Sequence, residues 1–225
     1  MRYYPIFVNL ENKHCLVVGA GDVGKRKIQS LLDSGAAAVT IIDTREPDSS
    51  LDSILKQGNV TYCCREFDDA DLNGQFLVIA CTTSEAINEH ISRVCNERGI
   101  LCNIADQPEK SSFIVPASVK QGDLTLAIST GGQSPALAKC ICRDLRESFG
   151  DEYARLLTLM GLIRPLMLDL ALETKENTAV FRKLVNSNLL TAIKDHDLDS
   201  VVEILKESLP EPLHDNIPEL LDGLV

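Results

Sequence analysis

Short apolar runs rich in β-branched residues alternate with amphipathic segments along the first half of the chain. The apolar runs predict five strands, at residues 14–18, 38–42, 60–64, 75–80 and 100–104. The amphipathic segments predict helices at residues 22–34, 51–57 and 84–98. Strands that alternate with helices are typical of a parallel, doubly wound sheet. Residues 1–112 are therefore expected to form an α/β domain.

The pattern changes after about residue 112. Two apolar runs, at residues 113–118 and 124–129, flank a Gln-Gly-Asp turn and predict an antiparallel hairpin. A helix is expected to start near Ser134, and the chain from residue 151 onward has a helical pattern. Helix breaks are expected near Pro165, residues 186–188 and Pro210. We therefore expect a small α+β segment at 113–148 and a helical C-terminal domain at 149–225.

A glycine motif, G-x-G-x-x-G, follows the first predicted strand directly and opens the first predicted helix. In such a motif Gly19 allows a tight turn, Gly21 lets the backbone approach a pyrophosphate, and Gly24 lets helix and strand pack closely. The phosphates would then lie at the positive end of the helix. The alternative for the bare motif is a glycine-rich turn that holds no ligand.

The second predicted strand ends at Asp43, about 20 residues past the glycine motif, where a carboxylate accepts hydrogen bonds from the adenine ribose. This context favours a Rossmann domain that binds a dinucleotide. A carboxylate also repels a 2′-phosphate, so the predicted cofactor is NAD, although Arg45 nearby leaves NADP open. The predicted cofactor-binding residues are Gly19, Gly21, Asp22, Val23, Gly24 and Asp43.

A second glycine-rich turn, Gly131-Gly132, follows the hairpin and precedes a helix with Ser134 as its expected N-cap and Pro135 at its first position. The N-terminus of this helix could hold an anion such as a carboxylate, with Lys139 adding positive charge on the same helix. A well-formed strand-to-helix connection without a ligand explains the same residues equally well.

Composition narrows the range of partners. The formal net charge is −11, which argues against nucleic acid or an anionic membrane as partner. No apolar run is long enough to span a bilayer and no signal peptide is evident, so a cytoplasmic location is expected. The eight cysteines are expected to be free thiols, and their spacing predicts no metal site.

Several motifs together resemble the precorrin-2 dehydrogenase and sirohydrochlorin ferrochelatase family, which also forms the N-terminal module of sirohaem synthases. The matching blocks occur in order at residues 4–8, 19–27, 102–106, 112–117 and 129–136. The resemblance implies NAD-dependent oxidation of the tetrapyrrole precorrin-2 to sirohydrochlorin, by a homodimer in which the hairpin segment contributes the dimer contact. It also implies a catalytic carboxylate at Asp106 and an active-site serine at Ser129. An Asp that caps the turn before Pro108 is the alternative for Asp106.

The substrate implied by this resemblance is a polycarboxylate, so an acidic chain must gather cations locally. Candidates are Lys25, Arg26, Lys27, Lys110, Lys120, Lys139 and Arg143. The predicted substrate-binding residues are Ser129, Gly131, Gly132, Ser134 and Lys139. Insertion of Fe²⁺ as a second activity stays open. A non-catalytic NAD-sensing module and a dehydrogenase for another metabolite are the rival interpretations.

Overall fold

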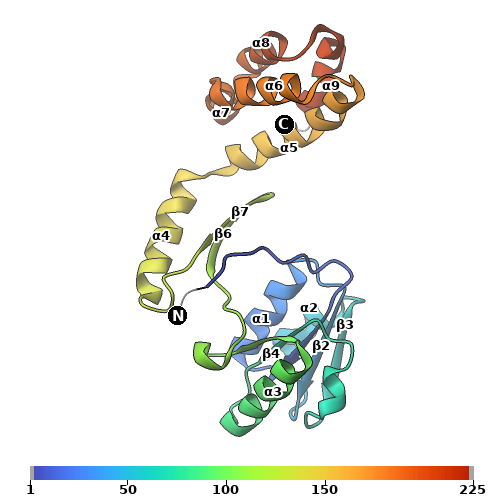
Figure 1. The fold of residues 1–225 in the computed structure, drawn as a ribbon, viewed down its shortest axis with the longest axis vertical. Coiled ribbons are helices and arrows are strands. Elements are labelled where there is room, and N and C mark those ends of the chain that lie inside the picture. Colours follow the sequence, from blue (N-terminus) through green and yellow to red (C-terminus); the bar gives the residue numbers. More distant parts are fainter. Residues whose placement is uncertain (1–2, 223–225) are drawn as a thin grey trace. The chain divides into compact units, whose positions relative to one another are not determined.

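A computed structural model describes residues 3–222 and divides the chain into two compact units, Met1–Val115 and Pro116–Val225 (Figure 1). Each unit has a hydrophobic core of its own. The three-part division at residues 112 and 148 stays a prediction.

The first unit is built on a parallel sheet of five strands in the order β3-β2-β1-β4-β5. The strands are β1 (His14–Val18), β2 (Ala38–Asp43), β3 (Val60–Cys64), β4 (Leu77–Ala80) and β5 (Leu101–Ile104). Their β-branched and aliphatic side chains suit strands that are covered on both faces. In register, Cys15 of the central strand lies between Val39 and Leu77.

Helices cover both faces of this sheet. Alternate strand residues point to opposite faces, so each strand contributes side chains to two cores. Cys15 and Val17 belong to the core that also holds buried residues of α1 (Asp22–Leu32) and α2 (Asp52–Leu55). Leu16 and Val18 belong to the core that holds those of α3 (Glu85–Arg98). Three 3₁₀ turns complete the unit, at Ser49–Leu51, Asp69–Leu72 and Pro108–Lys110.

The strand order creates a switch point between β1 and β4, since the chain proceeds from β1 to one side of the sheet and then crosses to the other. Doubly wound sheets bind ligands at the carboxyl ends of the strands beside such a point. Gly19, after β1, donates its N–H to the Ile42 carbonyl at 2.8 Å, and Cys81, after β4, donates its N–H to the Val18 carbonyl at 2.8 Å. The glycine motif therefore lies at the switch point.

The second unit begins with the hairpin of β6 (Ala117–Gln121) and β7 (Leu124–Ile128), an antiparallel pair. The first hairpin strand was expected at 113–118, which is wrong: residues 112–116 form no strand, and pairing starts only where Ala117 lies opposite Ile128. The helix α4 (Pro135–Ser148) follows, and the Ser134 hydroxyl caps it by accepting the Leu137 N–H at 3.1 Å.

The remaining helices form a bundle around one apolar core that includes Leu159, Ile163 and Leu205. They are α5 (Asp151–Asp169), α6 (Thr174–Asn186), α7 (Leu189–Lys194), α8 (Leu198–Ser208), a 3₁₀ turn (Glu211–Asn216) and α9 (Ile217–Asp222). The expected break at Pro165 is wrong, because α5 continues through it. A proline removes one backbone donor and crowds the carbonyl four residues earlier, but Leu159, Ile163 and Met167, on both sides of Pro165, are buried in one core that holds the helix together. Among the helices of residues 3–222, none combines the length and apolar character needed to span a bilayer.

Candidate functional site

The glycine motif forms a tightly packed loop between β1 and α1. A Cβ on Gly24 would lie 2.1 Å from the Gly19 carbonyl oxygen, so only glycine lets the helix approach the strand this closely. Gly19 has φ +99°, and a Cβ there would lie 2.7 Å from the Cys81 carbonyl oxygen. A Cβ on Gly21, by contrast, would meet only the end of the Arg45 side chain, at 3.9 Å. Two glycines thus fix the loop and the third leaves room for a ligand, as a pyrophosphate site requires.

Asp43, at the end of β2, is buried beside this loop and is tied to it by a hydrogen bond. One carboxylate oxygen, Oδ2, accepts the Ala20 N–H at 2.7 Å. The other, Oδ1, accepts the Arg45 backbone N–H at 2.9 Å and the Arg45 side chain at 3.2 Å. Burial acts to raise the pKa of Asp43, but the hydrogen bonds from Arg45 and Ala20 outweigh burial and hold the pKa below its ordinary value.

A pocket of about 380 Å³ opens next to Asp43. Its lining residues are Ala20, Gly21, Asp22, Lys25, Asp43, Arg45, Glu46, Pro47, Asp48, Leu51 and Tyr62. On its rim, Lys25 forms an ion pair with Asp48 at 2.5 Å, and this contact lowers the pKa of Asp48 to about 2. The Tyr62 hydroxyl donates to the Arg45 carbonyl at 2.7 Å. The pocket therefore lies between the glycine loop and the end of β2, where the adenosine half of a dinucleotide binds in a Rossmann domain.

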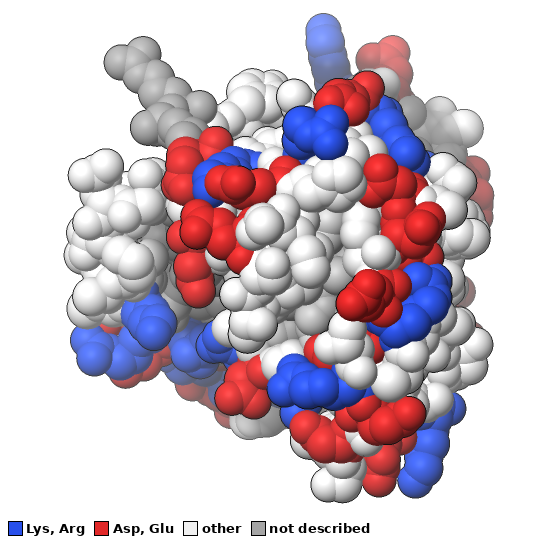
Figure 2. All heavy atoms as spheres, turned by 90° about the horizontal axis from the view of Figure 1, so that it is seen from below, with Lys and Arg blue, Asp and Glu red and all other residues white. Residues whose placement is uncertain are grey.

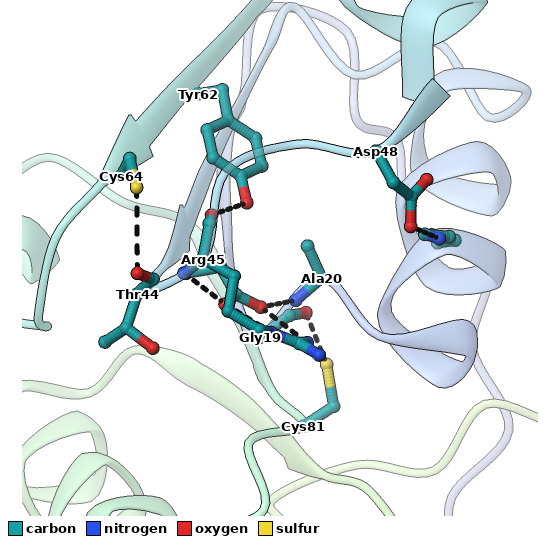
Figure 3. A network of polar contacts seen from close by, with 10 residues as sticks. Gly19, Ala20, Thr44, Arg45, Asp48, Tyr62, Cys64 and Cys81 are labelled. Atoms are coloured by element: carbon teal, nitrogen blue, oxygen red, sulfur yellow. Dashed lines mark hydrogen bonds and ion pairs between the residues drawn. The ribbon is translucent and has the colours of Figure 1, made fainter. Parts of the chain in front are cut away.

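Cys81, directly after β4, packs against this loop, a contact that the sequence did not reveal. Its thiol contacts the Gly19 carbonyl oxygen at 3.1 Å (Figure 3). It also contacts the Val18 carbonyl oxygen at 3.4 Å. Burial raises the pKa of the Cys81 thiol to about 12, so the group stays protonated and donates. The only signal in the sequence was its place directly after the fourth strand.

Asp106 lies just past β5, at the same edge of the sheet. It is exposed and has φ +60°, a left-handed conformation that is uncommon for a residue with a side chain. The segment that follows returns along β5: the Ser112 hydroxyl accepts the Cys102 N–H at 2.8 Å, and the buried Asn103 amide donates to the Phe113 carbonyl at 3.0 Å. These contacts hold both sides of the turn that presents Asp106.

The second glycine turn belongs to the other unit. Gly131 and Gly132 have φ of 61° and 84°, and the Ser129 hydroxyl accepts the Gly131 N–H at 3.1 Å. Ser134 caps α4, and Lys139 is exposed on that helix. The hydroxyls of Ser129 and Ser134 thus stabilise the turn itself, and their role toward a substrate stays a prediction, as does that of Asp106.

Most of the candidate cations have other partners or are exposed. Lys110 pairs with Glu85 at 3.1 Å and also contacts Glu89. Arg143 pairs with its neighbour Asp144 at 3.4 Å. Exposed candidates are Arg26, Lys120 and Lys139. Figure 2 shows acidic and basic side chains intermixed on one face of the molecule, unlike the basic stripe of a nucleic-acid-binding surface.

Metal-ligating side chains do not converge in the part of the chain that the structure describes: no group of three or more His, Cys, Asp or Glu residues could hold an ion there. All eight cysteines are free thiols, as expected.

The switch point, the glycine loop and the buried Asp43 define a Rossmann-type dinucleotide-binding protein. Residues 6–117 match a family model described as putative NAD(P)-binding, in agreement with the predicted cofactor, NAD. Residues 121–148 match a model described as sirohaem biosynthesis protein central. The chain belongs to the sirohaem synthase family that combines these two segments, which confirms the predicted family.

Known relatives extend the match along the chain. It is 32% identical over 216 residues to siroheme synthase 2 of Pectobacterium atrosepticum, covering 96% of this chain and 47% of that protein. It is 31% identical over 215 residues to the siroheme synthase of an Enterobacter species, covering 95% of this chain and 47% of that protein. The chain thus spans about half the length of the curated relatives it matches.

A solved structure of SirC, a precorrin-2 dehydrogenase, is similar in fold, with a TM-score of 0.76 and 24% sequence identity over 91% of this chain and 98% of that one. This likeness confirms the predicted fold, a Rossmann sheet followed by a small α+β segment and a helical C-terminal region.

Proposed function

We propose that the chain is an NAD-dependent dehydrogenase that oxidises precorrin-2 to sirohydrochlorin. The proposal rests on the position of Asp106, a carboxylate at the carboxyl edge of a dinucleotide-binding sheet. The turn that holds Asp106 there gives it a φ of +60°. Backbone strain of this kind is found at functional sites. Membership of the sirohaem synthase family supports a tetrapyrrole as the substrate.

The adenosine pocket favours NAD over NADP. Its lining includes four carboxylates, on Asp22, Asp43, Glu46 and Asp48, against two cations, on Lys25 and Arg45. Both cations already form ion pairs with carboxylates of the same pocket. A 2′-phosphate would therefore meet a negative field, whereas the hydroxyls of an unmodified ribose could donate to Asp43.

The reaction removes one hydride and one proton from the substrate carbon skeleton and so converts a C–C single bond into a double bond. A bound NAD would supply the hydride acceptor for the two electrons that the substrate loses. Asp106 accepts the proton and later releases it to solvent, which gives one H⁺ for each NADH formed. Within the second unit, the turn of Ser129–Ser134 is proposed to bind a substrate carboxylate.

The same family points to a homodimer formed through the hairpin segment, acting in the cytoplasm. The hairpin supports this proposal, because among the described residues it is a two-stranded sheet whose outer edges pair with no further strand and so could pair with a second copy.

Anaerobic assays with precorrin-2 and NAD test the proposal through the absorbance of NADH. The wild-type protein is expected to form NADH only when precorrin-2 is present, and Asp106→Asn to lower kcat about 100-fold or more, the contribution of a general base. Asp52→Asn, a matched change at an exposed position of α2, should be without effect. A wild-type protein that binds NADH but never reduces NAD would favour the NAD-sensing module instead.

A further inference from the structure

We infer that Lys27 binds a carboxylate of the substrate at the carboxyl edge of the sheet, beside Asp106. This inference rests on the proposed function, because it names the residue that recognises a polycarboxylate there. It also separates Lys27 from the other six basic residues that the sequence offered as candidates.

Lys27 lies on the side of α1 that faces the sheet. Gly24, Lys27 and Ile28 are spaced three and four residues apart, so they share one helix face. Ile28 is completely buried on this face, and a Cβ on Gly24 would lie 3.2 Å from the Cys81 sulfur. Lys27 is half-buried one turn further along. Helical side chains tilt toward the helix N-terminus, so the lysine stem extends back toward the carboxyl edge of the sheet.

The groups around Lys27 come from the ends of β4 and β5. Burial and the neighbouring Arg26 lower the pKa of Lys27, and the negative charge of Asp106 acts in the opposite direction. The backbone brings both groups to the edge that this helix face meets. A Cβ on Gly24, one turn before Lys27, would lie 3.2 Å from the Cys81 sulfur, and Ala105, next to Asp106, donates its N–H to the carbonyl of Ala80, next to Cys81, at 2.9 Å. The β4–β5 side of the sheet is opposite the β2–β3 side that carries Asp43, so Lys27 faces the nicotinamide half of the crevice.

Lys27 is also the candidate cation whose charge is least compensated. Lys25 and Lys110 are each held by carboxylates. Among residues 3–222 no carboxylate lies within ion-pairing distance of the Lys27 ammonium. A half-buried ammonium without such a partner binds an incoming anion strongly, because the ammonium is already partly desolvated in the free protein. A substrate carboxylate fits this position, and it would hold the ring next to Asp106.

The nearest alternative anion is the cofactor pyrophosphate. That group is expected at the first turn of α1, next to Gly21, where a Cβ would meet only the end of the Arg45 side chain. Lys27 comes five residues after Asp22, the first residue of the helix, and its helix face meets the segments that follow β4 and β5. Loss of the Lys27 charge should therefore raise KM for precorrin-2 if Lys27 binds a substrate carboxylate, and KM for NAD if it binds the pyrophosphate.

The test compares Lys27→Met, Lys27→Arg and the matched control Arg26→Met, an exposed neighbour on the same helix. Lys27→Met keeps an unbranched stem and is expected to raise KM for precorrin-2 about tenfold, equal to about 1.4 kcal/mol, while KM for NAD stays within about twofold. Lys27→Arg should restore most of the lost affinity, and Arg26→Met should match the wild type. NADH binding, followed by fluorescence, and thermal unfolding show whether each variant is folded.

An unchanged KM for precorrin-2 in a folded Lys27→Met would overturn the inference, and so would a rise confined to KM for NAD. A loss that Lys27→Arg does not rescue would also overturn it, because that result indicates packing rather than charge. None of these results affects the proposed function, which fails only if the wild-type protein itself forms no NADH from precorrin-2.

Discussion

Replacing Asp43 with asparagine separates the two roles of this carboxylate, in the loop and toward the ribose. The side chain is buried and accepts the Ala20 N–H at 2.7 Å through one oxygen and Arg45 donors at 2.9 and 3.2 Å through the other. Asparagine keeps the shape but has a single oxygen. Its NH₂ group must face either the Ala20 N–H or the Arg45 N–H, so one donor meets another donor.

The size of the effect follows from those contacts. A hydrogen bond to a charged group contributes about 1.5–3 kcal/mol, so Asp43→Asn should lower the free energy of unfolding by about 2 kcal/mol. Ribose hydroxyls would donate to a neutral amide oxygen in place of a carboxylate, which should raise the Kd for NADH about 10- to 100-fold. The preference for NADH over NADPH should fall, because the charge that repels a 2′-phosphate is gone.

NADH and NADPH titrations followed by nicotinamide fluorescence measure both affinities, and urea unfolding measures stability. The chain contains no Trp, which simplifies the fluorescence signal. Asp52→Asn, at an exposed site of α2, serves as the control and should change neither quantity. If Asp43→Asn is destabilised but binds NADH as tightly as the wild type, Asp43 supports the loop without contacting the ribose, and the cofactor assignment built on it is refuted.

Four further predictions concern packing, capping and pH. Gly24→Ala should cost about 1–3 kcal/mol of stability and weaken NADH binding, because the new Cβ would lie 2.1 Å from a backbone carbonyl oxygen, whereas Gly58→Ala, in open space, should be neutral by the same titrations. Leu159→Ala, at a completely buried site of α5, should lower the free energy of unfolding in urea by about 2–5 kcal/mol, much more than Leu157→Ala, which starts 38% exposed. Ser134→Ala should cost about 1 kcal/mol through the lost helix cap, and Ser134→Asp should retain most of it in the same assay. The lowered pKa of Asp43 stabilises the fold above the ordinary value of 3.8, so the stability gap between wild type and Asp43→Asn should close as the pH falls below about 3.8.

Much of the first unit could be predicted because local patterns and tertiary structure agree there. β1 and β3 have the predicted bounds, and α3 begins after its Ser84 cap and ends at Gly99 with φ +68°. Each of these elements carries its own start or stop signal. The glycine motif and Asp43 were predictable as a pair because a fixed strand-loop-helix-strand unit determines their spacing.

The sequence could not predict features that depend on contacts between residues far apart in the chain. Pro165 looked like a helix break, yet packing of Leu159, Ile163 and Met167 into one core keeps α5 continuous. Cys81 looked like a small apolar residue, and only the crossing between β3 and β4 brings its thiol to the Gly19 carbonyl. The choice of Lys27 among the basic candidates likewise depends on which lysines form ion pairs with carboxylates from distant segments.

The most direct test of the account is the anaerobic reaction of the wild-type protein with precorrin-2 and NAD, in parallel with Asp106→Asn and with NADH binding to both. We expect the wild type to form one NADH for each sirohydrochlorin, and Asp106→Asn to bind NADH normally but to turn over about 100-fold or more slowly. Equal turnover by the two proteins, or NADH binding without any precorrin-2-dependent reduction of NAD, would contradict it.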